Sequence, residues 1–195
     1  MTANKIKTAA LRLFAQNGYD SAPLSEIAKE VGIKTPSLYA HFSSKEDLFR
    51  AVFEDVLKEH EHRVEALIEE ITGRSIHDKL FSIWQDACRT YLVSELHMTF
   101  IKRAMLFPPA AMQEELRTRF TDSEITLSAA LVDIFTEGMD AGIIRQENTR
   151  DMLASYYCLL DGAFIQQFYY THDDFEQRMQ GVWRMYWFGI TSLHK

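Results

Sequence analysis

Apolar residues recur at helical spacing along most of this 195-residue chain, and no stretch alternates with the two-residue period of a half-buried strand. Only four prolines and eight glycines interrupt the pattern. We therefore predict an all-α fold of about nine helices, divided into a small N-terminal domain and a larger helical domain.

The first two predicted helices are short and amphipathic. The first spans residues 3–16 and ends at Asn17-Gly18, a pair that commonly terminates a helix. The second ends at Gly32, which can adopt the left-handed backbone that closes a helix. Its apolar face consists of residues at i, i+3, i+4 and i+7: Leu24, Ile27, Ala28 and Val31.

A third short helix is predicted over residues 36–42. Thr35 offers a side-chain oxygen for the N-cap, and Pro36 suits the first helical position because its missing N–H needs no partner there. Leu38 and Phe42 should then face inward. Three short helices with a glycine-containing turn between the last two are typical of a helix-turn-helix, whose second helix enters a major groove about 12 Å wide.

The remainder of the chain is also predicted to be helical. Ser43 followed by Glu46 has the spacing of a capping box, so a long fourth helix should begin there and continue to Ile71. Further helices are expected over residues 76–92, 98–107, 110–142 with a kink near 121–123, 149–170 and 174–193.

Charge is divided unevenly along the chain. A net charge of −7 would by itself disfavour binding to nucleic acid. Residues 1–50, however, carry seven Lys and Arg against five Asp and Glu, a balance of +2, whereas the rest carries 14 against 23, a balance of −9. Because phosphate repels an acidic surface, the N-terminal segment is the part of the chain suited to face DNA.

The sequence contains no signal peptide and no apolar run of the roughly 18 residues that a membrane span needs. We expect a cytoplasmic protein without a membrane partner. Cys88 and Cys158 lie far apart within helical patterns, and the seven histidines follow no metal-binding spacing, so we expect neither a disulfide nor a metal site.

Three segments near the N-terminus carry a specific family resemblance. Residues 27–33 read IAKEVGI, residues 37–42 read SLYAHF and residues 44–48 read SKEDL. Together they resemble the DNA-binding domain of the tetracycline-repressor (TetR) family, and the resemblance covers about residues 3–50. One departure is Pro23, which stands where the family usually has a Ser or Thr at the start of the second helix.

The resemblance implies a helix-turn-helix domain over residues 1–47 and a ligand-binding and dimerisation domain over residues 48–195. It also implies a homodimer that binds a palindromic operator in double-stranded DNA, most simply as a repressor that a ligand releases. A ligand held in the larger domain would act on the DNA-binding domain by tilting the long fourth helix.

The same resemblance assigns a DNA face to the third helix and the start of the fourth. Thr35 and Ser37 would read bases, and Lys45 would bind a phosphate. Each assignment has a structural alternative, since Tyr39 could be a core aromatic, Lys45 a solvated charge and Thr35 only a helix cap. The expected DNA-binding residues are Lys34, Thr35, Pro36, Ser37, Tyr39, His41 and Lys45.

In the architecture that the resemblance implies, large side chains on the central helices would surround a cavity. Such side chains favour an apolar or aromatic small molecule as effector. Core packing is the alternative for each of them, because an apolar stripe at helical spacing is usually core. The expected ligand-binding residues are Trp84, Cys88, Tyr91, Phe100, Met105, Tyr156 and Tyr157.

The last two helices carry more apolar surface than one neighbour should cover, which indicates contact with a second copy of the chain. Gly162 interrupts a strongly apolar helix at a cost of about 1 kcal/mol relative to Ala, and close approach of a partner helix would explain it. The expected interface residues are Gly162, Phe164, Phe168, Met179, Trp183 and Tyr186.

Two other functions remain open on the sequence alone. The chain could be a DNA-binding regulator controlled by a protein partner instead of a small molecule, if the aromatic cluster encloses no space. A helical-bundle enzyme is a more distant alternative, because no nucleophile motif, inward Glu-x-x-His pair or glycine-rich phosphate loop is present. We therefore assign no catalytic residue and no cofactor.

Overall fold

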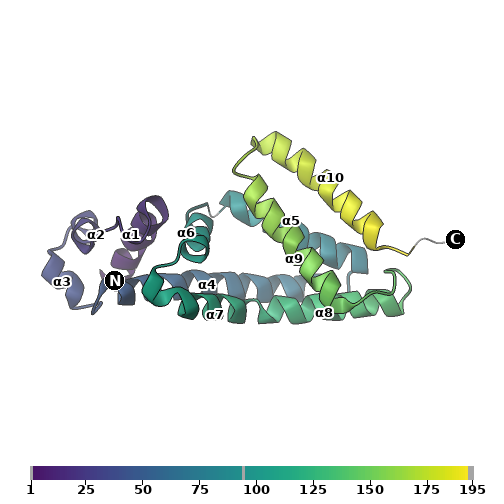
Figure 1. Ribbon diagram of the computed structural model, residues 1–195, viewed down its shortest axis with the longest axis horizontal. Coiled ribbons are helices and arrows are strands. Elements are labelled where there is room, and N and C mark those ends of the chain that lie inside the picture. The colour runs from purple at the N-terminus through teal and green to yellow at the C-terminus, as the bar shows by residue number, and fades with distance from the viewer. Residues whose placement is uncertain (1, 94, 193–195) are drawn as a thin grey trace. The chain divides into compact units, whose positions relative to one another are not determined.

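The computed structural model describes residues 2–93 and 95–192, with their side chains except those of residues 90–93. Within these ranges the chain forms ten α-helices, a 3-10 turn and one isolated backbone bridge, so the predicted all-α fold is confirmed (Figure 1). The elements are α1 Thr2–Asn17, α2 Leu24–Val31, α3 Thr35–Tyr39, α4 Lys45–Ile71, α5 Ile76–Val93, α6 Glu95–Leu106, η1 Ala110–Met112, α7 Gln113–Ser123, α8 Ile125–Asp140, α9 Thr149–Gln166 and α10 His172–Ile190.

The helices form two compact units. The first unit contains Met1–His62 and Ser94–Glu124, and the second contains Arg63–Val93 and Ile125–Lys195. The division differs from the expected one after residue 47, because residues 45–62 of α4 and all of α6 and α7 belong to the same unit as the N-terminal helices. The chain passes between the units inside α4, between α5 and α6, and between α7 and α8.

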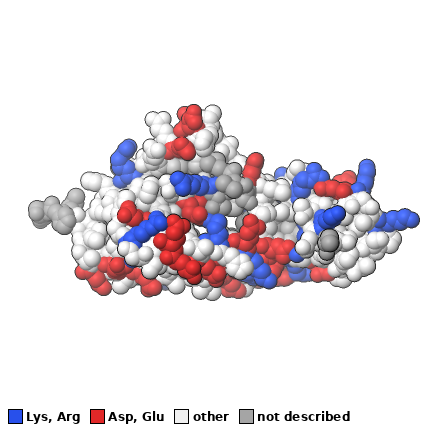
Figure 2. Space-filling model, turned by 180° about the vertical axis from the view of Figure 1, so that it is seen from behind, with Lys and Arg blue, Asp and Glu red and all other residues white. Residues whose placement is uncertain are grey.

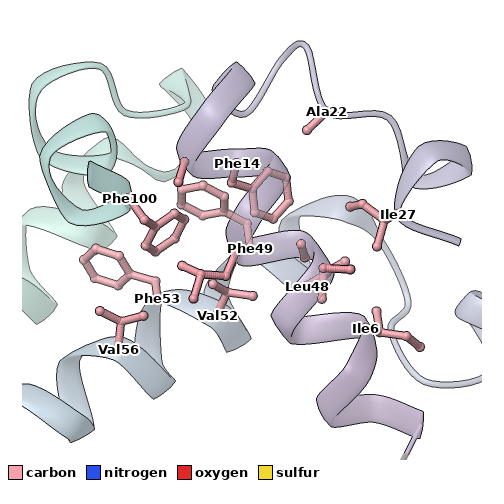
Figure 3. Close-up of a cluster of buried hydrophobic side chains, with 14 of the residues drawn as sticks. Ile6, Phe14, Ala22, Ile27, Leu48, Phe49, Val52, Phe53, Val56 and Phe100 are labelled. Carbon is pink, nitrogen blue, oxygen red and sulfur yellow. The ribbon is translucent and has the colours of Figure 1, made fainter. Parts of the chain in front are cut away.

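The core of the first unit is a cluster of phenylalanines from three helices (Figure 3). Phe100 in α6 lies 5.2 Å from Phe49 and 6.4 Å from both Phe14 and Phe53, measured between ring centroids. Its side chain is fully buried. Helix α6 is therefore part of the hydrophobic core that supports the helix-turn-helix.

The second unit is built around α5, which packs against α8, α9 and α10. Tyr156 in α9 is completely buried, and its hydroxyl donates a hydrogen bond of 2.6 Å to the carbonyl oxygen of Leu80. Gly138 in α8 allows close packing, because a Cβ at this position would lie 2.6 Å from the side chain of Ile144. Trp84 and Phe135 are also in this core.

Helix ends agree with the sequence patterns in part. Gly32 closes α2 in the left-handed conformation at φ 77°, as predicted. Thr35 is not the N-cap of α3, because that position belongs to Lys34, and Thr35 is already helical.

The start of α4 is also shifted by one residue from the prediction. The Ser44 hydroxyl accepts a hydrogen bond from the backbone N–H of Asp47, and the Asp47 carboxylate accepts one from the backbone N–H of Ser43. The capping pair is thus Ser44 and Asp47, not Ser43 and Glu46.

The predicted helix over residues 110–142 is two helices, α7 and α8, which are separated at Glu124. The kink expected near residues 121–123 is therefore a complete break. Helix α9 ends at Gln166, four residues earlier than predicted, and α10 begins two residues earlier, at His172. Asn148 and Thr171 cap the two helices with their side-chain oxygens.

Candidate nucleic-acid interface and sensor helices

Helix α3 has one buried side and one exposed side. Leu38 is fully buried in the core of the first unit, and this contact fixes the rotation of the short helix. Tyr39 is 54% exposed, so its alternative role as a core aromatic is wrong. Ser37 and Pro36 are also exposed, as are Lys34 and His41 at the two ends, whereas Thr35 is half-buried.

Lys45 is held in place at the first residue of α4. Its ammonium Nζ lies 4.4 Å from the centroid of the Tyr19 ring and donates a hydrogen bond of 3.3 Å to the carbonyl oxygen of Asp20. Partial burial lowers the pKa of Lys45 below its ordinary value of 10.5. Lys45 is therefore an oriented, half-buried cation and not a freely solvated charge.

Tyr19 is the residue beneath the Lys45 ammonium, and the sequence patterns did not single it out. Its ring packs against Phe14 and Phe49, with centroid distances of 5.9 and 5.3 Å. Burial and a hydrogen bond to Glu46 raise the pKa of its hydroxyl well above the ordinary value. The sequence feature that could have identified Tyr19 is its position directly after Gly18, the residue that follows the end of α1. An aromatic side chain at such a position can fold back onto the preceding helix.

The basic residues of the N-terminal segment are not equally available to DNA. Lys7 pairs with Asp55, Arg12 with Glu30 and Arg50 with Glu115. Lys34, at the N-cap of α3, is exposed. Lys5 on α1 and Lys29 on α2 are exposed as well. On the face seen in Figure 2, Lys and Arg side chains are spread over the N-terminal helices at the right, and acidic side chains are dense elsewhere.

The seven expected ligand-binding residues do not all lie in one unit. Trp84 and Tyr156 are buried in the core of the second unit, where Cys88 and Tyr157 pack against them as partly buried side chains. Phe100 and Met105 belong instead to the core of the first unit. The Tyr91 side chain lies outside the described residues.

Polar contacts among the ligand candidates of the second unit are few. The Tyr157 hydroxyl shares a hydrogen bond of 2.8 Å with that of Ser128. Burial raises the pKa of the Cys88 thiol to about 12, so this thiol stays protonated at neutral pH. The surroundings of Trp84, Cys88 and Tyr156 are therefore mainly apolar.

A groove of about 640 Å³ lies in the first unit between α4 and α7, and none of the seven ligand candidates lines it. Ion pairs cross between these two helices. Arg119 in α7 donates hydrogen bonds of 2.7 Å to Glu54 and 2.8 Å to Glu61 in α4, and Arg50 in α4 donates one of 2.8 Å to Glu115. Helix α7 is therefore fastened to the part of α4 that follows the recognition helix.

These contacts describe a helix-turn-helix whose recognition helix is exposed and whose neighbouring lysine is preoriented. Residues 6–52 match the family model described as bacterial regulatory proteins, tetR family. The helix-turn-helix segment of this chain is thus similar to the N-terminal domain of that family.

Two relatives and one solved structure indicate how far the similarity extends. The Escherichia coli K12 repressor ComR is 47% identical over 45 residues, which cover 23% of this chain and 21% of ComR. The fatty acid metabolism regulator protein of Bacillus subtilis is 26% identical over 147 residues, which cover 73% of this chain and 70% of that protein. The crystal structure of the Bacillus subtilis regulator FadR with stearoyl-CoA has a TM-score of 0.71 at 21% identity, and the match covers 96% of this chain and 98% of FadR.

The surface of the last two helices differs from the one expected from the sequence. Met179 and Trp183 are buried within the second unit, and Tyr186 is half-buried beside them, so these residues form the chain's own core. Gly162 is exposed, as is Phe168, and Phe164 is half-buried. The large apolar side chains of α10 that are exposed instead are Val182 at 37%, Met185 at 66% and Phe188 at 65%.

Two glycines on these helices border open space among the residues that the structure describes. A Cβ added at Gly162 in α9 or at Gly189 in α10 would meet nothing within 4 Å. Both glycines are exposed, like Met185 and Phe188.

In the part of the chain that the structure describes, no helix is long and apolar enough to cross a membrane. No group of three or more His, Cys, Asp or Glu side chains in these residues is placed to hold a metal ion.

Proposed function

We propose that this chain is a sequence-specific DNA-binding transcriptional regulator that reads the major groove with α3. The observation that carries the proposal is the exposed surface of Pro36, Ser37 and Tyr39 on a helix whose rotation is fixed by the buried Leu38. A fixed helix presents its polar side chains in one orientation, which base recognition requires.

The contacts divide into two kinds by their chemistry. Lys34 and Lys45 supply positive charge to phosphates on either side of the groove, and the positive dipole end at the start of α4 adds to this. Thr35 and Ser37 offer hydroxyl groups to base edges, and Pro36 offers an apolar contact to a thymine methyl. Tyr39 and His41 extend the contact to the sugar-phosphate backbone.

We also propose that the chain acts as a homodimer. One short recognition helix contacts too few bases to be selective, and a twofold axis would match two copies to a palindromic operator. The exposed Met185 and Phe188, with the unoccupied space beside Gly162 and Gly189, favour α9 and α10 as the interface. Glycines let partner helices approach closely, which would compensate for their cost within a helix.

The effector that we propose is an apolar small molecule bound in the second unit near Trp84, Cys88, Tyr156 and Tyr157, and its binding would release a repressor from DNA. The similarity to a fatty acid metabolism regulator extends over most of the chain, and FadR was solved with stearoyl-CoA. A long acyl chain is therefore the first ligand to test.

A selection from randomised duplexes of about 30 base pairs tests the DNA-binding proposal, because this length holds two half-sites about one helical turn apart. We expect the bound fraction to become enriched in one inverted repeat. Recovered sequences that stay as random as the starting pool would contradict sequence-specific binding.

Tryptophan fluorescence tests the effector, because Trp84, Trp183 and Trp187 all lie in the second unit. We expect stearoyl-CoA to change the emission and to lower affinity for the selected duplex about 5- to 150-fold, the usual range of allosteric coupling. Coenzyme A without the acyl chain is the matched control. If both molecules leave emission and DNA affinity unchanged, the proposal of an acyl ligand is wrong. The DNA-binding proposal is unaffected by this result.

A further inference from the structure

We propose that Arg103 in α6 is a positioning residue that holds the turn between α1 and α2, and through this turn keeps Lys45 in place for phosphate binding. The inference rests on the proposed function, because it concerns the same DNA-binding surface. Arg103 itself would not touch DNA. All of the contacts involved lie within the first unit.

The first contact joins α6 to the end of α1. The Arg103 guanidinium Nη2 donates a hydrogen bond of 3.1 Å to the carbonyl oxygen of Gln16, in the last turn of α1. Carbonyl groups at a helix C-terminus lack intrahelical partners and carry partial negative charge, so a guanidinium is a suitable cap. Gly18 follows with φ +80°, and a Cβ added there would lie 3.3 Å from Arg103 Nη1.

The second contact lies on the residues that immediately follow. Tyr19 provides the ring above which the Lys45 ammonium lies at 4.4 Å, and Asp20 provides the carbonyl that accepts its hydrogen bond. Both partners of Lys45 are therefore within four residues of the carbonyl that Arg103 binds. If the turn shifts, the ammonium loses the two contacts that orient it.

The core beneath the turn makes this connection stiff. Phe100 is one helical turn before Arg103 on α6, and its ring packs against Phe14 and Phe49. Those two rings are also the ones that hold Tyr19. Helix α6 thus supports the turn both through the guanidinium and through the aromatic core.

A double-mutant cycle tests the connection, with affinity for the selected duplex as the readout. Arg103→Gln should weaken binding about fivefold in the wild-type background, a factor equal to about 1 kcal/mol, which a hydrogen bond to a charged group can supply. In a Lys45→Ala background the same change should have less than about a twofold effect, because the residue being positioned is gone. Arg103→Gln should also flatten the salt dependence, as the loss of one phosphate contact does.

Arg117→Gln is the matched control, since it removes the same charge from an exposed site in α7 whose partner is Glu114 on the same helix. It should leave affinity and salt slope unchanged. Hydrogen exchange supplies a readout without DNA, in which Arg103→Gln, but not Arg117→Gln, should speed exchange of the amides of residues 17–22.

The possible outcomes separate this inference from the proposed function. Equal effects of Arg103→Gln in both backgrounds, or unchanged exchange at residues 17–22, would overturn the role of Arg103 and leave DNA binding intact. If the wild-type chain binds no duplex, the proposed function fails, and the positioning role fails with it.

Discussion

At the scale of single residues, the surface of α3 separates contacts that specify sequence from contacts that supply affinity. Ser37 and Lys34 are both exposed, but a hydroxyl forms directional hydrogen bonds with base edges, whereas a flexible ammonium interacts with phosphate by charge. Their removal should therefore change binding in different ways.

We predict that Lys34→Ala weakens binding to all duplexes alike and lowers the slope of log affinity against log salt by about one. Ser37→Ala should instead reduce discrimination at one base position by about 1 kcal/mol and leave the slope unchanged. Titrations of the selected duplex and its single-base variants at several salt concentrations measure both effects. Identical profiles for the two variants would show that the roles are wrongly assigned.

Phe100 was expected to bind ligand, yet it lies in the core that supports the recognition helix. We predict that Phe100→Ala lowers the free energy of unfolding by about 3–5 kcal/mol, because it leaves a cavity among the surrounding rings. Phe100→Leu should cost less, since it keeps much of the volume. Denaturant unfolding monitored by circular dichroism tests this, and a loss below about 1 kcal/mol for the alanine variant would contradict a core role.

At the scale of helices, the ion pairs between α4 and α7 are the clearest electrostatic feature. The hydrogen bonds from Arg119 hold the pKa of Glu54 below its ordinary value of 4.5. A carboxylate with a lowered folded-state pKa stabilises the fold above its unfolded-state pKa, and this contribution is lost as the pH falls through the folded value.

We predict that Arg119→Met lowers the free energy of unfolding at pH 7 by about 0.5–1 kcal/mol, a modest effect because both partners are partly exposed to water. The difference in free energy of unfolding between Arg119→Met and wild type should shrink as the pH falls below 4.5. Arg117→Met is the control and should have no comparable pH dependence. A deficit for Arg119→Met that persists unchanged in acid would mean that packing, not charge, accounts for it.

Local signals in the sequence predicted most helices, and their failures have local causes. Gly32 ended α2 as expected because only a left-handed residue closes a helix in that way. At α4, both Ser43-Glu46 and Ser44-Asp47 satisfy the capping pattern, and the pattern alone does not choose between them.

Tertiary relations were harder to predict than helices, since periodicity shows which face of a helix is apolar but not what covers it. Met179 and Trp183 are covered by the chain's own core, not by a partner. Phe100 joins the core of the N-terminal helices although it follows α5 in sequence. The exposure of Tyr39 and the position of Lys45 over Tyr19 likewise depend on contacts that sequence spacing does not contain.

At the scale of the whole molecule, function in our account depends on two copies held in a fixed relation. Met185 and Phe188 expose 66% and 65% of their surfaces on α10. We predict that Met185→Glu with Phe188→Glu shifts the dimer to monomer at micromolar concentration, because buried unpaired carboxylates are strongly unfavourable.

Sedimentation measures the state of this double variant, and binding to the selected inverted repeat should fall with dimer content. Gln177→Glu is the control, because it adds a negative charge at another exposed position of α10. A double variant that stays dimeric would place the interface elsewhere on the chain.

The central claim is that α3 reads DNA, and a side-by-side duplex selection tests it most directly. The wild-type chain is compared with a variant carrying Lys34→Ala, Ser37→Ala and Tyr39→Ala, and with a control carrying substitutions at Glu114, Arg117 and Thr121 on α7. We predict that wild type and control enrich the same inverted repeat and that the α3 variant enriches none. If the α3 variant recovers the wild-type repeat, another surface reads the DNA and the account is wrong.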